Sequence, residues 1–196
     1  MISSKKDLRY YLKCDKIALM VPQSQKRPKM FDRIWKYEIL LRKSEYLFNR
    51  WLNSKSLIHK IRFYLTYYFF RKMGERLNIE IWLNQFGPGL SIAHSGTIVV
   101  NGNAKIGDNC RIHEGVAIGA TNGSNKAAII GRNVFIGSGA KIIGEIIIAD
   151  NVCIGAGSVV VKDILTPGVT VAGNPAKVIS GNDSSTNLIR ATEIIE

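Results

Sequence analysis

The stretch "IGDNCRIHEGVAIG", Ile106–Gly119, decides the fold because it places an isoleucine at every sixth position. The register extends in both directions and is interrupted by one polar residue, Ser124. Its apolar members are Val100, Ile106, Ile112, Ile118, Ile130, Ile136, Ile142, Ile148, Ile154 and Val160. In an α-helix, at about 100° per residue, side chains six positions apart would lie about 120° apart. We therefore predict a triangular β-solenoid in which each six-residue side points one isoleucine inward.

The segment before this repeat has a different pattern. Apolar and aromatic residues in 31–52 and 57–77 recur at helical spacing, with Ser56 as a helix start and Gly74 and Asn78 as candidate helix ends. We expect these aromatic residues to pack in the core or between subunits. The sequence thus predicts an N-terminal helical region over 1–78, a β-solenoid domain over 79–180 and a C-terminal tail over 181–196.

The net charge of +12 is concentrated in the helical region. Residues 1–80 contain 19 Lys and Arg against 7 Asp and Glu, and the remainder is neutral. This division argues against a nucleic-acid-binding protein and allows contact with an anionic membrane surface through the basic segment. Cys14, Cys110 and Cys153 show neither metal-ligand spacing nor a disulfide framework. We expect a cytoplasmic protein, with peripheral contact at the inner membrane face as the alternative.

Four stretches, "IGDNCRIHEGVAIGAT", "IGRNVFIGSGAKIIG", "IGAGSVVVKD" and "VAGNPAKVI", resemble the hexapeptide-repeat acyltransferases. "FGPGLSIAHSGTIVVNGNAKIGDNC" is similar to their serine O-acetyltransferase branch, and we expect a relative that acts in polysaccharide biosynthesis. The resemblance implies a mainly β fold, a left-handed parallel β-helix behind the α-helical N-terminal region. It also implies a homotrimer, or a dimer of trimers, that binds acetyl-CoA in the groove between neighbouring coils.

The chemistry implied by this resemblance needs a base for the acceptor hydroxyl. His94, in "GPGLSIAH", matches the family's catalytic histidine. Glu80 is the nearest counterpart of the acidic residue that orients it, although the segment between them is one residue shorter than in the family. His113 follows the inward Ile112, so strand alternation points it outward. We expect His94 to be the base and His113 to contact the substrate, with His113 as the alternative base.

Small residues near the coil corners match the family's coenzyme A contacts, although tight turns would explain them equally. These candidate cofactor-binding residues are Gly119, Ala120, Thr121, Ser138, Gly139, Ala156 and Gly157, with Lys162 and Lys177 for the nucleotide phosphates. No metal is expected, because only two histidines, His94 and His113, fall within the repeats.

The acceptor is a separate question. Serine enzymes of the family hold the amino acid with an acidic residue before the catalytic histidine and an Arg-His pair in a later loop. Here Ala93, Lys126 and Ala127 occupy the corresponding places. An unpaired charge in a closed pocket costs about 1–3 kcal/mol, so we expect a sugar or surface-polysaccharide hydroxyl as acceptor. Serine O-acetylation is the alternative, and a non-catalytic scaffold or a γ-carbonic-anhydrase-like metal protein is a third hypothesis.

Overall fold

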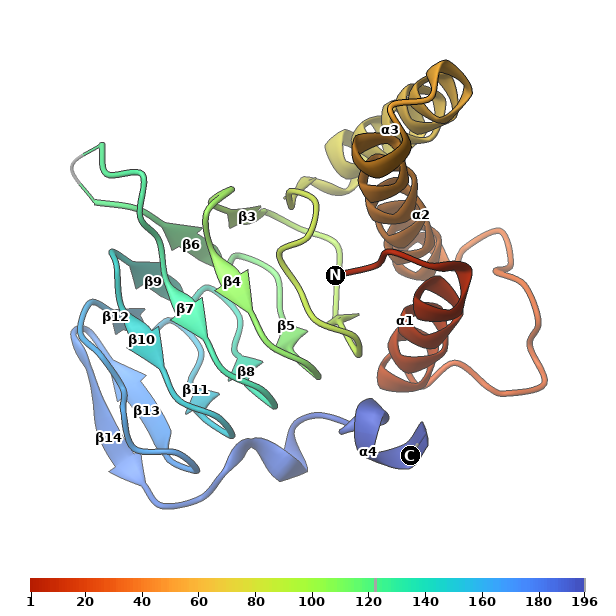
Figure 1. Ribbon diagram of the computed structural model, residues 1–196. Coiled ribbons are helices and arrows are strands. Elements are labelled where there is room, and N and C mark those ends of the chain that lie inside the picture. Colours follow the sequence, from red (N-terminus) through yellow and green to blue (C-terminus); the bar gives the residue numbers. More distant parts are fainter. Residues whose placement is uncertain (122, 196) are drawn as a thin grey trace.

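The computed structural model describes residues 1–121 and 123–195, and it contains a β-helix with three helices against its first coil (Figure 1). The coils stack on one another, and their strands form three sheets, which we call the first, second and third faces. The first face contains β1 (Ile79–Glu80), β3 (Ile98–Val100), β6 (Ala117–Gly119), β9 (Lys141–Ile143) and β12 (Val159–Val160). The second contains β4 (Lys105–Ile106), β7 (Ile129–Ile130) and β10 (Ile147–Ile148). The third contains β2 (Ser91–Ile92), β5 (Arg111–Ile112), β8 (Phe135–Ile136), β11 (Cys153–Ile154), β13 (Thr170–Gly173) and the antiparallel β14 (Ala176–Ser180).

The predicted isoleucine register forms the core of the β-helix. On the third face, Ile136 pairs in parallel with Ile112 on one side and Ile154 on the other. All ten predicted apolar positions are buried, none with more than 5% of its surface exposed. Glycine follows several of them because the coils come close together: a Cβ on Gly107 would lie 2.7 Å from the carbonyl carbon of Gly131.

The interruption at Ser124 marks an insertion in one coil. Ile112 and Ile136 are neighbours in the stack, although the chain between them is six residues longer than between Ile136 and Ile154. The extra length forms the loop over residues 120–128, where Ser124 is exposed. The one polar residue of the register is therefore the one whose position lies outside the core. Within this loop, residue 122 lies outside the described residues.

Asparagines form a ladder at the corner between the second and third faces. Asn109, Asn133 and Asn151 all have left-handed backbone conformations, with φ of 56°, 57° and 61°, which asparagine tolerates better than most residues. Asn109 Nδ2 donates to Asn133 Oδ1 at 2.8 Å, and Asn133 Nδ2 donates to Asn151 Oδ1 at 3.0 Å. Because the coils are in register, asparagine occupies the same turn position in three successive coils.

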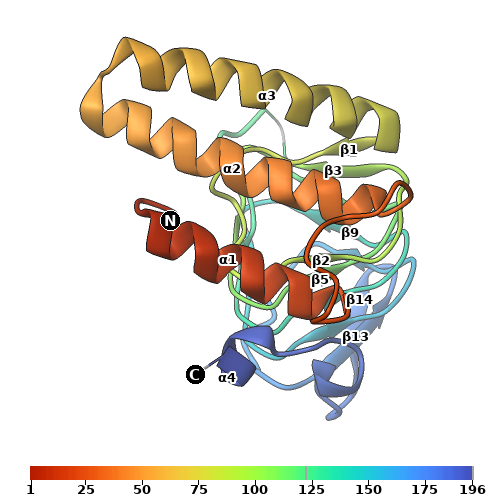
Figure 2. The same cartoon turned by 90° about the vertical axis from the view of Figure 1, so that its right-hand side faces the viewer.

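The C-terminal segment packs on this ladder. Its elements are η1 (Ser184–Thr186) and α4 (Ala191–Ile195). The backbone N–H of Thr192 donates to Asn109 Oδ1 at 3.1 Å, and Asn109 Nδ2 donates to Thr192 Oγ1 at 2.7 Å. Ala191 is buried with Cys14 and Ala18 of the first helix, which lies beside α4 in Figure 2. The described part of the tail therefore joins the coils to the helical region.

The helical region comprises α1 (Lys5–Ala18), α2 (Arg33–Ser54) and α3 (Leu57–Leu77), which lie side by side in Figure 2. As the sequence predicts, α3 begins after Ser56 and ends at Asn78, which has a left-handed conformation. Gly74 lies inside α3 rather than at its end, and a Cβ there would come within 2.6 Å of the Ile79 carbonyl oxygen. None of the described helices combines the length and the apolar character needed to cross a membrane.

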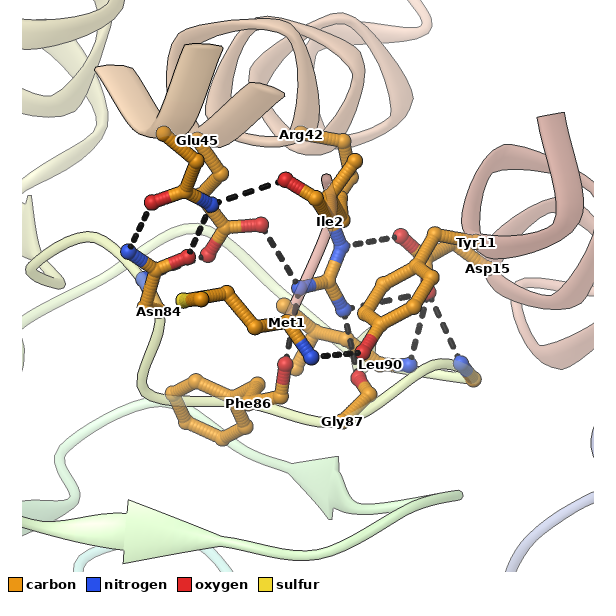
Figure 3. A network of polar contacts seen from close by, with 12 residues as sticks. Met1, Ile2, Tyr11, Asp15, Arg42, Glu45, Asn84, Phe86, Gly87 and Leu90 are labelled. Atoms are coloured by element: carbon orange, nitrogen blue, oxygen red, sulfur yellow. Dashed lines mark hydrogen bonds and ion pairs between the residues drawn. The ribbon is translucent and has the colours of Figure 1, made fainter. Parts of the chain in front are cut away.

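A buried arginine fastens α1 and α2 to the first coil (Figure 3). Arg42 Nε donates to Asp15 Oδ2 at 2.7 Å, and Nη1 donates to Glu45 Oε2 at 3.1 Å. The guanidinium also donates to the carbonyl oxygens of Phe86, at 2.9 Å, and Gly87, at 2.6 Å. Arg42 is fully buried, so these contacts compensate a charge that is costly to remove from water.

Carboxylates of α1 and α2 hold the next residues of the same coil. Asp15 Oδ1 accepts hydrogen bonds from the backbone N–H groups of Gly89 and Leu90, each at 2.9 Å. Glu38 Oε1 accepts from the N–H of Ile92 at 3.0 Å, and burial raises the pKa of Glu38 well above its ordinary value. The helical region thus fixes the backbone of the segment that leads to His94.

The asparagine ladder generates a stability prediction. Asn133→Ala removes side-chain hydrogen bonds and puts alanine, which tolerates positive φ less well than asparagine, at this turn, so we expect the free energy of unfolding to fall by about 1–3 kcal/mol. Chemical denaturation monitored by circular dichroism measures the change. Asn103→Ala, at an exposed turn position, is the matched control and should change the free energy little. Equal losses for the two variants would show that the ladder adds no stability.

Candidate active site

The two histidines of the repeats meet at one corner of the β-helix. His94 follows β2 and His113 follows β5, and these strands pair with Ile92 opposite Ile112. Their rings lie edge to face with centroids 5.9 Å apart. We call this corner, residues 93–97, 113–116, 137–140 and 155–158, the histidine corner. Histidine is the side chain most often used to accept or deliver a proton in catalysis.

His113 is the more enclosed of the two histidines. Its ring lies edge to face with Phe135, with centroids 5.1 Å apart, and its Nδ1 is 3.4 Å from Ser138 Oγ. Burial, followed by the positive charge of Arg111, lowers the pKa of His113 below its ordinary value. His94 is exposed. An incoming substrate can therefore reach the His94 ring more easily than the His113 ring, and the assignment of His94 as the base stays a prediction.

An acidic residue, Glu114, completes the cluster. Its Oε2 lies 3.8 Å from His113 Nδ1, and one ligand atom from each of His94, His113 and Glu114 falls within 4.8 Å of the others. The neighbouring Ser138 side chain holds the pKa of Glu114 below its ordinary value, so the carboxylate is ionised at neutral pH. These are the residues that a metal ion would use if one bound here. The absence of a metal requirement for this protein remains a prediction.

The predicted partnership of Glu80 with His94 does not form within the described chain. Glu80 is exposed on β1 of the first face, where it pairs with Val99, whereas His94 follows a strand of the third face. No hydrogen bond or ion pair joins the two among the described residues. The sequence analysis missed Glu114, although the pairing of Ile92 with Ile112, continued by two residues, sets position 114 opposite His94.

The predicted coenzyme A residues, apart from Lys177, fall into two groups on one chain. Ser138, Gly139, Ala156 and Gly157 belong to the histidine corner. Gly119 ends β6 and is followed by Ala120 and Thr121, and Lys162 follows β12; these residues lie at the corner between the first and second faces, which we call the loop corner. Lys177 lies apart on β14. A single groove can use both groups if a neighbouring copy supplies one of them.

Comparison with known proteins extends this picture. The family model described as bacterial transferase hexapeptide (six repeats) matches residues 127–162. The chain is similar to serine acetyltransferases of Helicobacter pylori, 35% identical over 127 residues, and of Buchnera aphidicola, 36% identical over 108 residues. These matches cover 63% and 53% of this chain. They span 74% of the Helicobacter protein but only 41% of the Buchnera protein.

Solved structures agree with the sequence comparison. Serine acetyltransferase from Brucella abortus superposes with a TM-score of 0.74 at 27% identity, covering 92% of this chain and 72% of that one. The same enzyme in complex with coenzyme A superposes with a TM-score of 0.68 at 27% identity, covering 90% of this chain and 68% of that one. The left-handed β-helix behind N-terminal helices, predicted from the resemblance, is confirmed.

These relatives correct the predicted acceptor. The sequence analysis favoured a glycan because Ala93, Lys126 and Ala127 lack the charges expected for binding an amino acid. The relatives are serine acetyltransferases, not enzymes of a polysaccharide-biosynthesis branch. Charges absent from the aligned positions are present elsewhere in the fold, which brings Glu114 beside the histidines and Arg111 close enough to lower the pKa of His113.

The environment of His113 predicts its titration. The imidazole should lose its proton below the ordinary midpoint of about 6.5 and so stay neutral to lower pH. Glu114→Gln removes a charge that favours imidazolium and should lower the midpoint further. Arg111→Gln removes a charge that disfavours imidazolium and should raise it. NMR titration of the ring protons measures the three midpoints, and a wild-type value above 6.5 would contradict this account.

Proposed function

The chain belongs to the serine acetyltransferases of the hexapeptide-repeat transferase family, and on this basis we propose that it transfers an acetyl group from acetyl-CoA to the hydroxyl of serine. The observation that carries the proposal is the histidine corner, where exposed His94 lies beside His113. Small residues at the same corner leave the backbone accessible to the extended pantetheine arm. The coenzyme A complex of the Brucella relative supports the choice of donor.

The reaction needs one proton acceptor and one path for the leaving group. Neutral His94 takes the proton of the serine hydroxyl as its oxygen attacks the thioester carbonyl carbon. The tetrahedral intermediate collapses with cleavage of the carbon–sulfur bond, and the imidazolium returns the proton to the departing thiolate. The products are O-acetylserine and coenzyme A. His113, held against Phe135, limits the positions that the His94 ring and the acceptor can take.

The active unit in this proposal is a homotrimer. On one chain, the histidine corner and the loop corner are different edges of the triangular coil, so a groove between two copies would combine the histidines of one with Thr121 and Lys162 of the next. In such a groove, Lys162 is placed to meet the nucleotide phosphates. Association of two trimers, peripheral membrane contact and a cytoplasmic location stay predictions from the sequence.

The base assignment predicts the effect of His94→Ala. With purified protein, acetyl-CoA and serine, we expect wild-type protein to form O-acetylserine and His94→Ala to lose about 10²–10⁴-fold in kcat. Mass spectrometry of the amino acid and release of free thiol report the two products. His59→Ala, in α3 away from the repeats, is the control and should retain activity. Full thioester cleavage by His94→Ala would transfer the role of base to His113, and no acetylation of serine by wild-type protein would overturn the proposed function.

The trimer predicts a molecular mass in solution. Light scattering coupled to size-exclusion chromatography should give three times the chain mass of 21.8 kDa, or twice that value if trimers pair. In mixtures of inactive His94→Ala with a Thr121→Trp variant that blocks the loop corner, trimers containing both chains should regain activity. This gain is expected because one groove then combines two intact corners. A monomeric mass with full activity would contradict the shared site.

A further inference from the structure

Free serine presents two charges that a serine acetyltransferase must bind. Its ammonium and carboxylate are attached to one carbon, and neither gives up water readily unless an opposite charge replaces it. The places where the sequence resemblance expects these partners do not provide them. Ala93 and Ala127 are uncharged, and Lys126 pairs with Glu145 at 2.9 Å in the exposed loop. The partners of the substrate must therefore come from elsewhere.

Glu114 has the properties of an ammonium ligand. Its carboxylate is ionised and its side chain is 39% exposed. Oε2 itself is buried and has no hydrogen-bond partner among the described residues, although it lies only 3.8 Å from His113 Nδ1. The Gly96 backbone passes so close that a Cβ there would lie 2.8 Å from Glu114 Cβ. The carboxylate is thus held beside the catalytic histidines with unused acceptor capacity.

Arg111 supplies the opposite charge. It precedes His113 by two residues, so both side chains leave the same face of the coil. Its Nη1 donates to Ser91 Oγ at 2.7 Å, and no other hydrogen bond of the guanidinium is formed among the described residues. Most of its donors are therefore available. Its charge reaches His113, because it contributes to the lowered pKa of that ring.

We propose that Glu114 binds the ammonium and Arg111 the carboxylate of the acceptor amino acid, which directs its hydroxyl to His94. The proposal rests on the proposed function and names the residues that determine its specificity. Opposite charges flank His113 in the sequence, and a small zwitterion needs one partner of each sign. We call Glu114 and Arg111 the clamp. It lies on and next to the strand that leads to His113, whereas the family's charged partners lie at the places of residues 93 and 126–127.

The test uses three acceptors with intact protein and saturating acetyl-CoA. Serine has both charges, ethanolamine has only the ammonium, and 3-hydroxypropanoate has only the carboxylate. Glu114→Gln should raise KM about tenfold or more for serine and ethanolamine and leave 3-hydroxypropanoate unchanged. Arg111→Gln should raise KM similarly for serine and 3-hydroxypropanoate and leave ethanolamine unchanged. Each variant is measured at the optimum of its own pH profile, because both substitutions shift the pKa of His113.

Controls separate this clamp from a general loss of function. Lys126→Gln changes the exposed loop cation and should leave every KM unchanged, and Arg111→Lys should recover part of the affinity for serine. The KM for acetyl-CoA should stay constant in all variants. Serine acetylation with no selective change of KM in the Glu114 and Arg111 variants would overturn the clamp alone. A raised KM for serine in Lys126→Gln would move the clamp to the loop, and an inability of wild-type protein to acetylate serine would refute the proposed function itself.

Discussion

Parallel hydrogen bonding between successive coils is the constraint on which the rest of the structure depends. Backbone N–H groups along the strands bond to the coil beside them, as from His113 N to Ile136 O at 3.1 Å, so a residue cannot move along its strand without losing the register of a whole face. Residues one coil apart are therefore neighbours in space. The inward column is the isoleucine core, one corner column is the asparagine ladder, and another sets His94, Glu114 and Ser138 opposite one another, with His113 next to them.

The helical region holds the backbone of the first coil, which is the end of the stack that carries His94. Its contacts with residues 86–92 are mainly polar and directed at backbone groups, with Arg42 on two carbonyl oxygens and Asp15 and Glu38 on three N–H groups. A buried ion cluster adds little stability compared with an apolar core, but removing one member leaves an unpaired charge and is costly. The cluster thus specifies how α1 and α2 sit on the first coil and, through that coil, where His94 lies.

The six-residue register predicted the coil, its strands and the residues of its core, because the period of a solenoid is local in sequence. The same register located the insertion at Ser124. The helices over 31–52 and 57–77 followed from their spacing, with Gly74 misjudged because a glycine needed for close packing resembles one that ends a helix. Handedness came from the family resemblance, since periodicity is the same in either hand.

The site was less accessible from sequence. His94 and His113 could be named from a motif and from alternation, but their neighbours depend on which coil lies against which. Glu114 and Arg111 become relevant only when β2 pairs with β5, and without them the acceptor was wrongly expected to be a glycan. Glu80 was chosen by its place in the chain, yet the corner between the faces separates it from His94.

The most direct test of the account is a crystal structure of the protein with coenzyme A and serine. We expect the serine hydroxyl within hydrogen-bonding distance of His94, the coenzyme sulfur beside it, and a second chain lining the same groove. Serine or coenzyme bound away from the histidine corner, or a His94 ring covered by its own chain, would contradict it.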